Sequence, residues 1–117
     1  MRGEKQKREV RTALVEYLEG LTVLFVFRGG WIDAITIKRG LIDLEELGLW
    51  LKGTGYLEEL GGIAFGEWFR SAFGEKAGGE YLGIPIVNIS PRNRKDAGVI
   101  LEGIRRWLDE FFPLPDR

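Results

Sequence analysis

Apolar residues in the first part of the chain recur at the spacing of one face of an α-helix. Between residues 4 and 19 they follow an i, i+3, i+4, i+7, i+8 series, at Val10, Ala13, Leu14, Tyr17 and Leu18. Gly20 comes next, and helices commonly end at glycine. The pattern therefore predicts a helix over residues 4–19.

The following segments have the composition of β-strands. Residues 21–28 carry β-branched and aromatic side chains on both faces, which is typical of a strand inside a sheet. Gly29-Gly30 is a turn signal, so residues 31–38 are predicted to be the second strand of a hairpin. Because side chains alternate along a strand, one face of this second strand is expected to carry Trp31, Asp33, Ile35 and Ile37.

Two helices are expected in the middle of the chain. Asp43 and Glu46 have the spacing of a capping box, which predicts a helix over residues 44–52. Glycine is frequent from residue 53 to residue 83, with a short helical turn expected at 56–60 and a helix at 63–73. The helices 44–52 and 63–73 are rich in apolar residues, so they are expected to be deeply buried or covered by a partner.

The C-terminal part gives the strongest signals. Residues 83–89 form a short apolar run that predicts a strand. Ser90 and Pro91 are a suitable cap and first residue for a helix over 91–112. The buried stripe of this helix is expected to contain Ala97, Ile100, Leu101, Ile104, Leu108 and Phe111.

These elements predict one α+β domain spanning residues 1–117. The expected order is α-β-β-α-α-β-α, with a single small sheet, a hairpin plus one further strand, packed with about four helices. A chain of 117 residues, 44% of them hydrophobic, is large enough to bury a core of its own.

Charge is distributed unevenly along the chain, although the net charge is only −1. Residues 1–42 have eight cations against five acids, residues 43–80 have three against eight, and residues 81–117 have six against five. A globally basic nucleic-acid coat protein is excluded. Any basic surface has to be built from the two ends of the chain.

The chain has no cysteine and no histidine. This inventory excludes disulfides, thiolate nucleophiles, zinc fingers, haem–histidine ligation and Ser-His-Asp catalysis, and no metal site or cofactor is predicted. Methionine and amide side chains are scarce while Glu, Arg and Lys are abundant, which is typical of a heat-adapted organism. No apolar run reaches 18 residues and the chain begins with charged residues, so we expect a cytoplasmic protein with no membrane partner.

The start of the last helix is the first candidate binding site. Arg92, Arg94 and Lys95 lie in its first turn, where the helix dipole already supplies positive charge. Together with the Ser90 cap and Asn93, these residues could bind a nucleic acid or another phosphate-containing ligand. Alternatively, the three cations pair with acids of residues 43–80.

Two further segments are candidates for binding or catalysis. Arg28-Gly29-Gly30 could approach an anion, but turn geometry also explains the two glycines. Asp33 is the candidate for a metal-dependent nuclease. In nucleases of the restriction type, an acid on one strand faces an acid-x-lysine motif on the next. Here Thr36 takes the place of the second acid, and alternation predicts that Asp33 and Lys38 point to opposite faces.

Aromatic residues indicate a second kind of surface. Four tryptophans and seven phenylalanines are many for this length. Some are expected in the core and the rest in a homo-oligomer interface, and the interface candidates are Trp50, Phe65, Trp68, Phe69 and Phe73.

Three hypotheses follow. The first is a non-catalytic binding module that self-associates through its apolar helices. The second is a nucleic-acid or phosphate-ligand binder that uses the Ser90–Lys95 helix start. The third, a metal-dependent nuclease around Asp33, is the one that would make the protein an enzyme.

Overall fold

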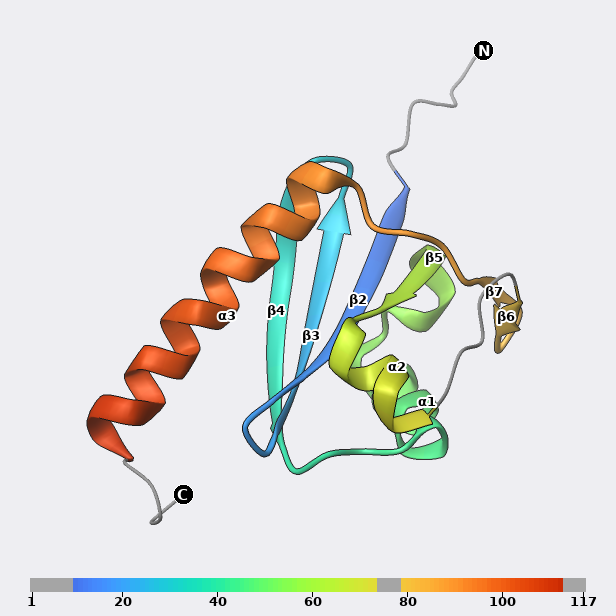
Figure 1. Ribbon diagram of the computed structural model, residues 1–117. Helices are drawn as coiled ribbons and strands as arrows, with labels where there is room; N and C mark the ends of the chain where they lie inside the picture. Colours follow the sequence, from blue (N-terminus) through green and yellow to red (C-terminus); the bar gives the residue numbers. More distant parts are fainter. Residues whose placement is uncertain (1–9, 74–78, 113–117) are drawn as a thin grey trace.

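The structure, a computed structural model, describes residues 10–73 and 79–112 (Figure 1). These residues form three α-helices, one short 3-10 helix and two sheets. In chain order the elements are β2 (Arg11–Leu18), β3 (Leu21–Arg28), β4 (Trp31–Arg39), α1 (Leu44–Thr54), the 3-10 helix η1 (Leu57–Glu59), β5 (Leu60–Phe65), α2 (Glu67–Phe73), β6 (Glu80–Tyr81), β7 (Ile84–Pro85) and α3 (Pro91–Phe111).

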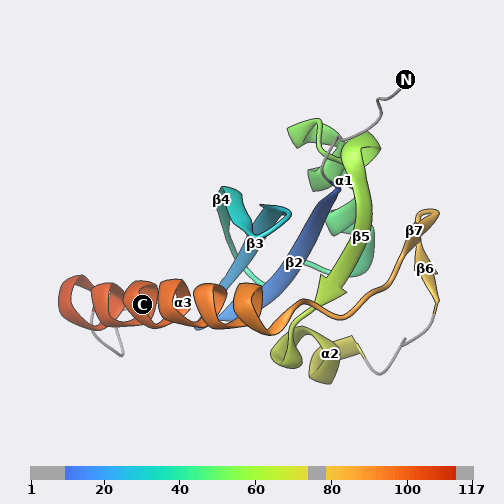
Figure 2. The same cartoon turned by 90° about the horizontal axis from the view of Figure 1, so that it is seen from above.

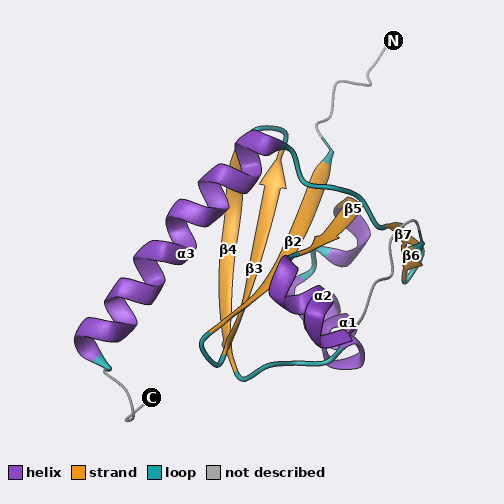
Figure 3. Ribbon diagram, viewed as in Figure 1, coloured by secondary structure: helices purple, strands orange, loops and turns teal. Residues whose placement is uncertain are grey.

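The main sheet has four strands in the order β4-β3-β2-β5 (Figure 3). Strands β2, β3 and β4 form an antiparallel meander, and β5 returns through α1 to pair parallel with β2. Ile86, from the segment after β7, pairs with Ile63 of β5 through an isolated parallel bridge. The short strands β6 and β7 make a separate two-stranded sheet.

The fold-class prediction is wrong in its first element. Residues 11–18 are a strand, and the part of the predicted helix before Val10 lies outside the described residues. The side chains of this strand are apolar on both faces because helices cover both, and such a run also fits a helical spacing. Glu19 and Gly20, which were expected to end a helix, have positive φ angles of 47° and 87° and form the turn into β3.

The prediction is wrong again between residues 60 and 89. The expected helix at 63–73 is strand β5 followed by the short helix α2, and the expected strand at 83–89 is reduced to β7 and one bridge. A single small sheet with four helices and the order α-β-β-α-α-β-α is therefore replaced by a mixed four-stranded sheet, a two-stranded sheet and three α-helices in the described residues.

Elements with strong local signals are confirmed. The hairpin of β3 and β4 turns at Gly29-Gly30, and β3 lies inside the sheet. In α1, the side chain of Asp43 accepts the Glu46 N–H while the Glu46 side chain accepts the Asp43 N–H, which is the predicted capping box. Ser90 caps α3, and Pro91 is its first residue.

Helices lie on both faces of the main sheet (Figure 2), and each face has a hydrophobic core. On one face, helix α1 covers β2, β3 and β5 through Leu47 and Leu51, and Phe69 of α2 joins this core. On the other face, α3 packs through Ala97 against side chains of β2, β3 and β5 that include Phe25 and Phe27. In the view of Figure 2, the C-terminal half of α3 runs past the edge strand β4.

A β-bulge in β4 changes which residues share a face. Val26 pairs with Ala34 but Phe27 pairs with Ile32, so Asp33 is the extra residue. Its side chain reaches Arg11 and Arg28 on the α1 side of the sheet, whereas Ile32 packs in the α3-side core. The predicted grouping of Asp33 with Ile35 and Ile37 on one face is therefore wrong, because simple alternation does not anticipate a bulge.

Candidate functional site

Three segments that are distant in sequence meet at the end of the main sheet where β3 turns into β4 (Figure 1). The side-chain amide of Asn93 in α3 donates a hydrogen bond of 3.1 Å to the carbonyl of Gly29. The N–H of Gly29 in turn donates to the carbonyl of Val10, at 3.4 Å. The start of α3, the Gly29-Gly30 turn and the start of β2 are thus held together by hydrogen bonds.

The first turn of α3 has few free backbone donors. Pro91 has no N–H, and the N–H of Asn93 donates to the Ser90 hydroxyl at 3.1 Å. The N–H of Arg94 donates to the carbonyl of Ser90. Arg92 therefore retains the first-turn N–H that bonds no described residue, and an anion at this helix start would depend mainly on side chains.

Arg92, Arg94 and Lys95 are exposed, and none of them forms an ion pair with an acid in residues 10–73 or 79–112. The alternative in which they pair with acids of residues 43–80 is therefore not realised among the described residues. Arg92 and Lys95 are three positions apart and share one face of the helix, while Arg94 points to another. We call Arg92, Lys95 and the adjoining Gly29-Gly30 turn the basic tip.

The guanidinium of Arg92 lies over the hairpin turn. A Cβ atom built on Gly30 would be 3.5 Å from Nη1 of Arg92. On either side of the turn, Arg28 and Trp31 are directly opposite each other in the register of β3 and β4. Trp31 is 71% exposed, so an aromatic ring stands in solvent beside the basic tip.

Asn93 is the polar residue at the seam between α3 and the turn. It is only 6% exposed, and its Oδ1 accepts no hydrogen bond from the described residues. A buried oxygen without a donor costs on the order of 1–3 kcal/mol. Because this oxygen is itself buried, Asn93 serves the tip through its hydrogen bond to Gly29 and not as an exposed ligand contact.

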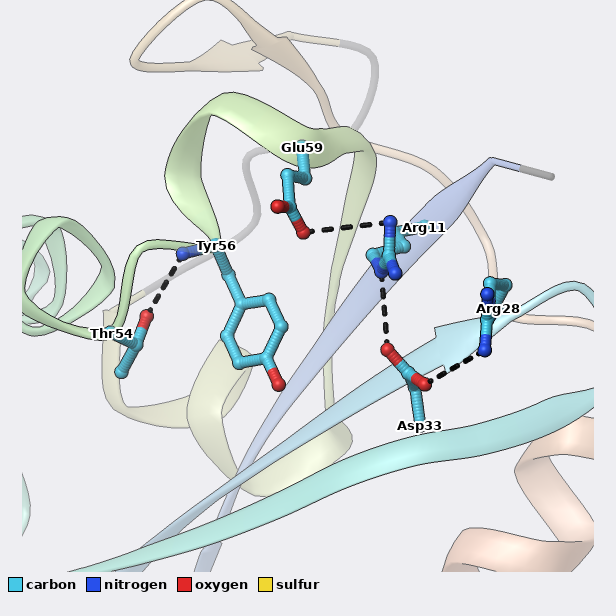
Figure 4. A network of polar contacts seen from close by, with 6 residues as sticks. All are labelled: Arg11, Arg28, Asp33, Thr54, Tyr56 and Glu59. Atoms are coloured by element: carbon cyan, nitrogen blue, oxygen red, sulfur yellow. Dashed lines mark hydrogen bonds and ion pairs between the residues drawn. The ribbon is translucent and has the colours of Figure 1, made fainter. Parts of the chain in front are cut away.

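Asp33 belongs to a network of four charged residues on the α1 side of the sheet (Figure 4). One carboxylate oxygen accepts from Nε of Arg11 at 3.1 Å, and the other lies 3.5 Å from Arg28. Arg11 also pairs with Glu59 at 3.5 Å, and its hydrogen bond with Asp33 raises the pKa of its guanidinium. Both oxygens of Asp33 are thus occupied by arginine.

This arrangement does not favour the nuclease hypothesis. Lys38 faces Thr22 at the other end of β3, far along the strand from Asp33. Within residues 10–73 and 79–112, no group of three or more Asp, Glu, His or Cys residues is placed to hold a metal ion. Asp33 serves as an ion-pair partner on the edge strand instead.

The four predicted interface residues whose side chains the structure describes do not form one surface patch. Phe69 is 1% exposed and lies in the core, where its ring is 4.8 Å from that of Tyr17. Phe65 and Trp50 are partly buried against the same core, whereas Trp68 is 70% exposed. The side chain of Phe73 lies outside the described residues.

Glu16, a half-buried acid, is at the opposite end of β2 from the basic tip. Its Oε1 accepts hydrogen bonds from the N–H groups of Tyr17, Trp68 and Phe69, at 3.2, 3.2 and 3.4 Å. Burial raises the pKa of this carboxyl, and the backbone donors partly offset that rise. Glu16 thus supplies an acceptor for the start of α2 from a neighbouring strand.

Sequence reasoning identified the cations of α3 but not Trp31. From the sequence, Trp31 is predicted only to lie on a strand, and Arg28 only to lie at a turn that could approach an anion. The signal that was available is the Arg-Gly-Gly-Trp order, because a two-residue hairpin turn places its flanking residues opposite each other.

No helix in the described part of the chain is long and apolar enough to cross a membrane. Comparisons of this chain with protein-family models, with curated proteins and with solved structures find no match.

Proposed function

We propose that the protein binds phosphate groups of a nucleic acid or another phosphate-containing ligand through the basic tip. The observation that carries this proposal is that Arg92, Arg94 and Lys95 form no ion pair with a described acid. Cations clustered at a helix N-terminus oppose the helix dipole, and an anion at this position relieves that cost.

The geometry supports the same ligand chemistry. Arg92 and Lys95 present a guanidinium and an ammonium on one helix face, and the Arg92 N–H is available between the cap and the turn.

Binding of linear polyphosphate, a polyanion without bases, tests this proposal. Wild-type protein is expected to bind it with an affinity that falls as salt concentration rises. The Arg92→Gln/Lys95→Gln variant is expected to bind about tenfold more weakly, because two charge-assisted contacts are lost.

The control variant is Lys38→Gln/Arg39→Gln. It removes the same charge from two exposed cations at the other end of β4. Equal losses in the two variants, or no binding by the wild type, would refute a site at the basic tip.

Self-association is a second candidate function, through a different surface from the predicted one. Strand β4 is an edge of the main sheet, and Ile35 and Ile37 on it are exposed. An edge strand offers unpaired backbone groups to a second chain, and antiparallel self-pairing is compatible with a twofold axis. In α3, Trp107 lies with its ring centroid 5.7 Å from that of Phe111 and 5.2 Å from that of Phe112, and all three residues are exposed.

Sedimentation equilibrium at high micromolar concentration tests this second candidate. A dimer that becomes monomeric in an Ile35→Lys/Ile37→Lys variant would support pairing at β4. A wild-type protein that remains monomeric would exclude it.

A further inference from the structure

We infer that Trp31 is a stacking platform for the bases of a single-stranded nucleic acid whose phosphates bind the basic tip. This inference rests on the proposed function and names the ligand class of the same site. It uses an observation that a purely electrostatic site does not require, which is an exposed indole next to the turn residue over which Arg92 lies.

The exposure of Trp31 has no structural explanation among the described residues. It is 71% exposed and is absent from both cores, and no described aromatic ring packs against it. Burial of a large aromatic side chain stabilises a fold, and Trp31 makes no such contribution, so its indole is available for a partner.

Cations lie on both sides of the turn next to this indole. Arg28, opposite Trp31 in the strand register, pairs with Asp33, whereas Arg92 lies over the adjacent Gly30 and pairs with no described acid. Single-stranded nucleic acid offers the matching chemistry, because its bases stack on aromatic rings while its phosphates contact neighbouring cations. The charge at this end thus matches a polyanion.

A duplex does not fit this platform as well as a single strand does. Bases in a duplex are stacked on one another, and only an unstacked base exposes a face to a protein ring.

Trp68 provides a matched comparison within the same chain. It is 70% exposed, nearly as much as Trp31, but it lies on α2 at the opposite end of the main sheet (Figure 1). A general affinity of exposed tryptophans for bases would involve both residues. A platform at the basic tip would involve Trp31 alone.

The experiment compares a short single-stranded oligothymidylate with an abasic strand of the same length and charge, by fluorescence anisotropy of labelled strands. Wild-type protein is expected to bind the oligothymidylate between about 5-fold and 150-fold more tightly than the abasic strand. Trp31→Ala is expected to bring this ratio close to one, Trp31→Phe to retain part of it, and Trp68→Ala to leave it unchanged. A duplex of the same sequence is expected to show no loss in Trp31→Ala.

Each alternative result has one meaning. A ratio that persists in Trp31→Ala, or that is already close to one in wild-type protein, overturns the stacking inference while polyphosphate binding keeps the proposed function. Wild-type protein that binds neither the strands nor polyphosphate overturns both. Equal losses in Trp31→Ala and Trp68→Ala also overturn the inference, because the effect would then not belong to the basic tip.

Discussion

Replacing Glu16 by alanine tests how strongly helix α2 is held against the main sheet. In the native structure, one oxygen of Glu16 accepts hydrogen bonds from Tyr17 and from the first turn of α2, at Trp68 and Phe69. The other oxygen, Oε2, fills the space beside Gly66. A Cβ atom built on Gly66 would be only 2.0 Å from it. Alanine removes all of these contacts at once.

The expected loss can be worked from these contacts. Removing a capping acceptor destabilises a helix by about 1 kcal/mol, and a buried donor left without an acceptor adds on the order of 1 kcal/mol. Water can replace the bond at Trp68, which is exposed, more easily than the bond at the buried Phe69. We therefore expect Glu16→Ala to lower the free energy of unfolding by about 2 kcal/mol.

Guanidinium unfolding at neutral pH measures this change. The matched control is Glu58→Ala, which removes an exposed acid that makes no ion pair with a described residue, and its effect should stay within about 0.5 kcal/mol. Gly66→Ala should resemble Glu16→Ala, because the new methyl group displaces the carboxylate. If Glu16→Ala is no more destabilising than Glu58→Ala, then Glu16 does not hold α2.

Glu16→Gln separates the charge from the hydrogen bonds. The amide oxygen can still accept the three N–H groups, but the side chain no longer titrates. Burial raises the folded-state pKa of Glu16 above 4.5, so the folded protein binds the proton more tightly than the unfolded chain does. Relative to Glu16→Gln, the wild type should therefore be most stable below pH 4.5 and lose stability as pH rises through the folded pKa. The opposite trend would show that the backbone donors outweigh desolvation at this carboxyl.

Two other changes test local features of the fold. Ser90→Ala removes the hydroxyl that accepts the Asn93 N–H and should lower the free energy of unfolding by about 1 kcal/mol. Ser90→Asp keeps an acceptor and should retain most of the wild-type stability. Equal stability of Ser90→Ala and wild type would contradict the cap. Tyr81→Phe removes the hydroxyl that donates to the Leu44 carbonyl and should cost about 1 kcal/mol, while Tyr56→Phe should cost little. Burial raises the pKa of Tyr81 to about 12, so the folded protein holds the phenolic proton more tightly than the unfolded chain does. The difference in free energy of unfolding between wild type and Tyr81→Phe should therefore disappear as pH rises from 10.0 toward 12. A difference that does not change with pH in that range would contradict this account.

The parts of the fold that could be predicted are those specified by nearby residues. Gly29-Gly30 determines a hairpin turn, Asp43 with Glu46 determines a helix start, and Ser90-Pro91 determines another. In each case the signal is contained within about four residues, so it does not depend on the rest of the chain.

The parts that failed depend on distant partners. Residues 11–18 have apolar side chains at spacings that suit a helix, and they form a strand because β3 and β5 pair on either side. Residues 60–65 are a strand because β2 lies parallel beside them, a pairing that spans about forty residues of intervening chain. The bulge at Asp33 is likewise a product of the pairing with β3.

The candidate site also has one part that nearby residues specify and one part that depends on distant contacts. The cations at the start of α3 are adjacent in sequence, so their clustering was predictable, but their lack of described acidic partners depends on where the acidic middle segment folds. The position of Arg92 over the Gly29-Gly30 turn, next to Trp31 in the chain, could not be predicted, because it results from the contact between α3 and that turn.

The most direct test of a phosphate-binding tip is to map the backbone amide resonances that shift when polyphosphate is added. The proposal predicts that the largest shifts, and the earliest to saturate, occur at Gly29, Gly30 and residues 92–95, and that they disappear in Arg92→Gln/Lys95→Gln. Largest shifts at the opposite end of the sheet, around Lys38 and Arg39, or shifts that the double variant retains, would contradict it.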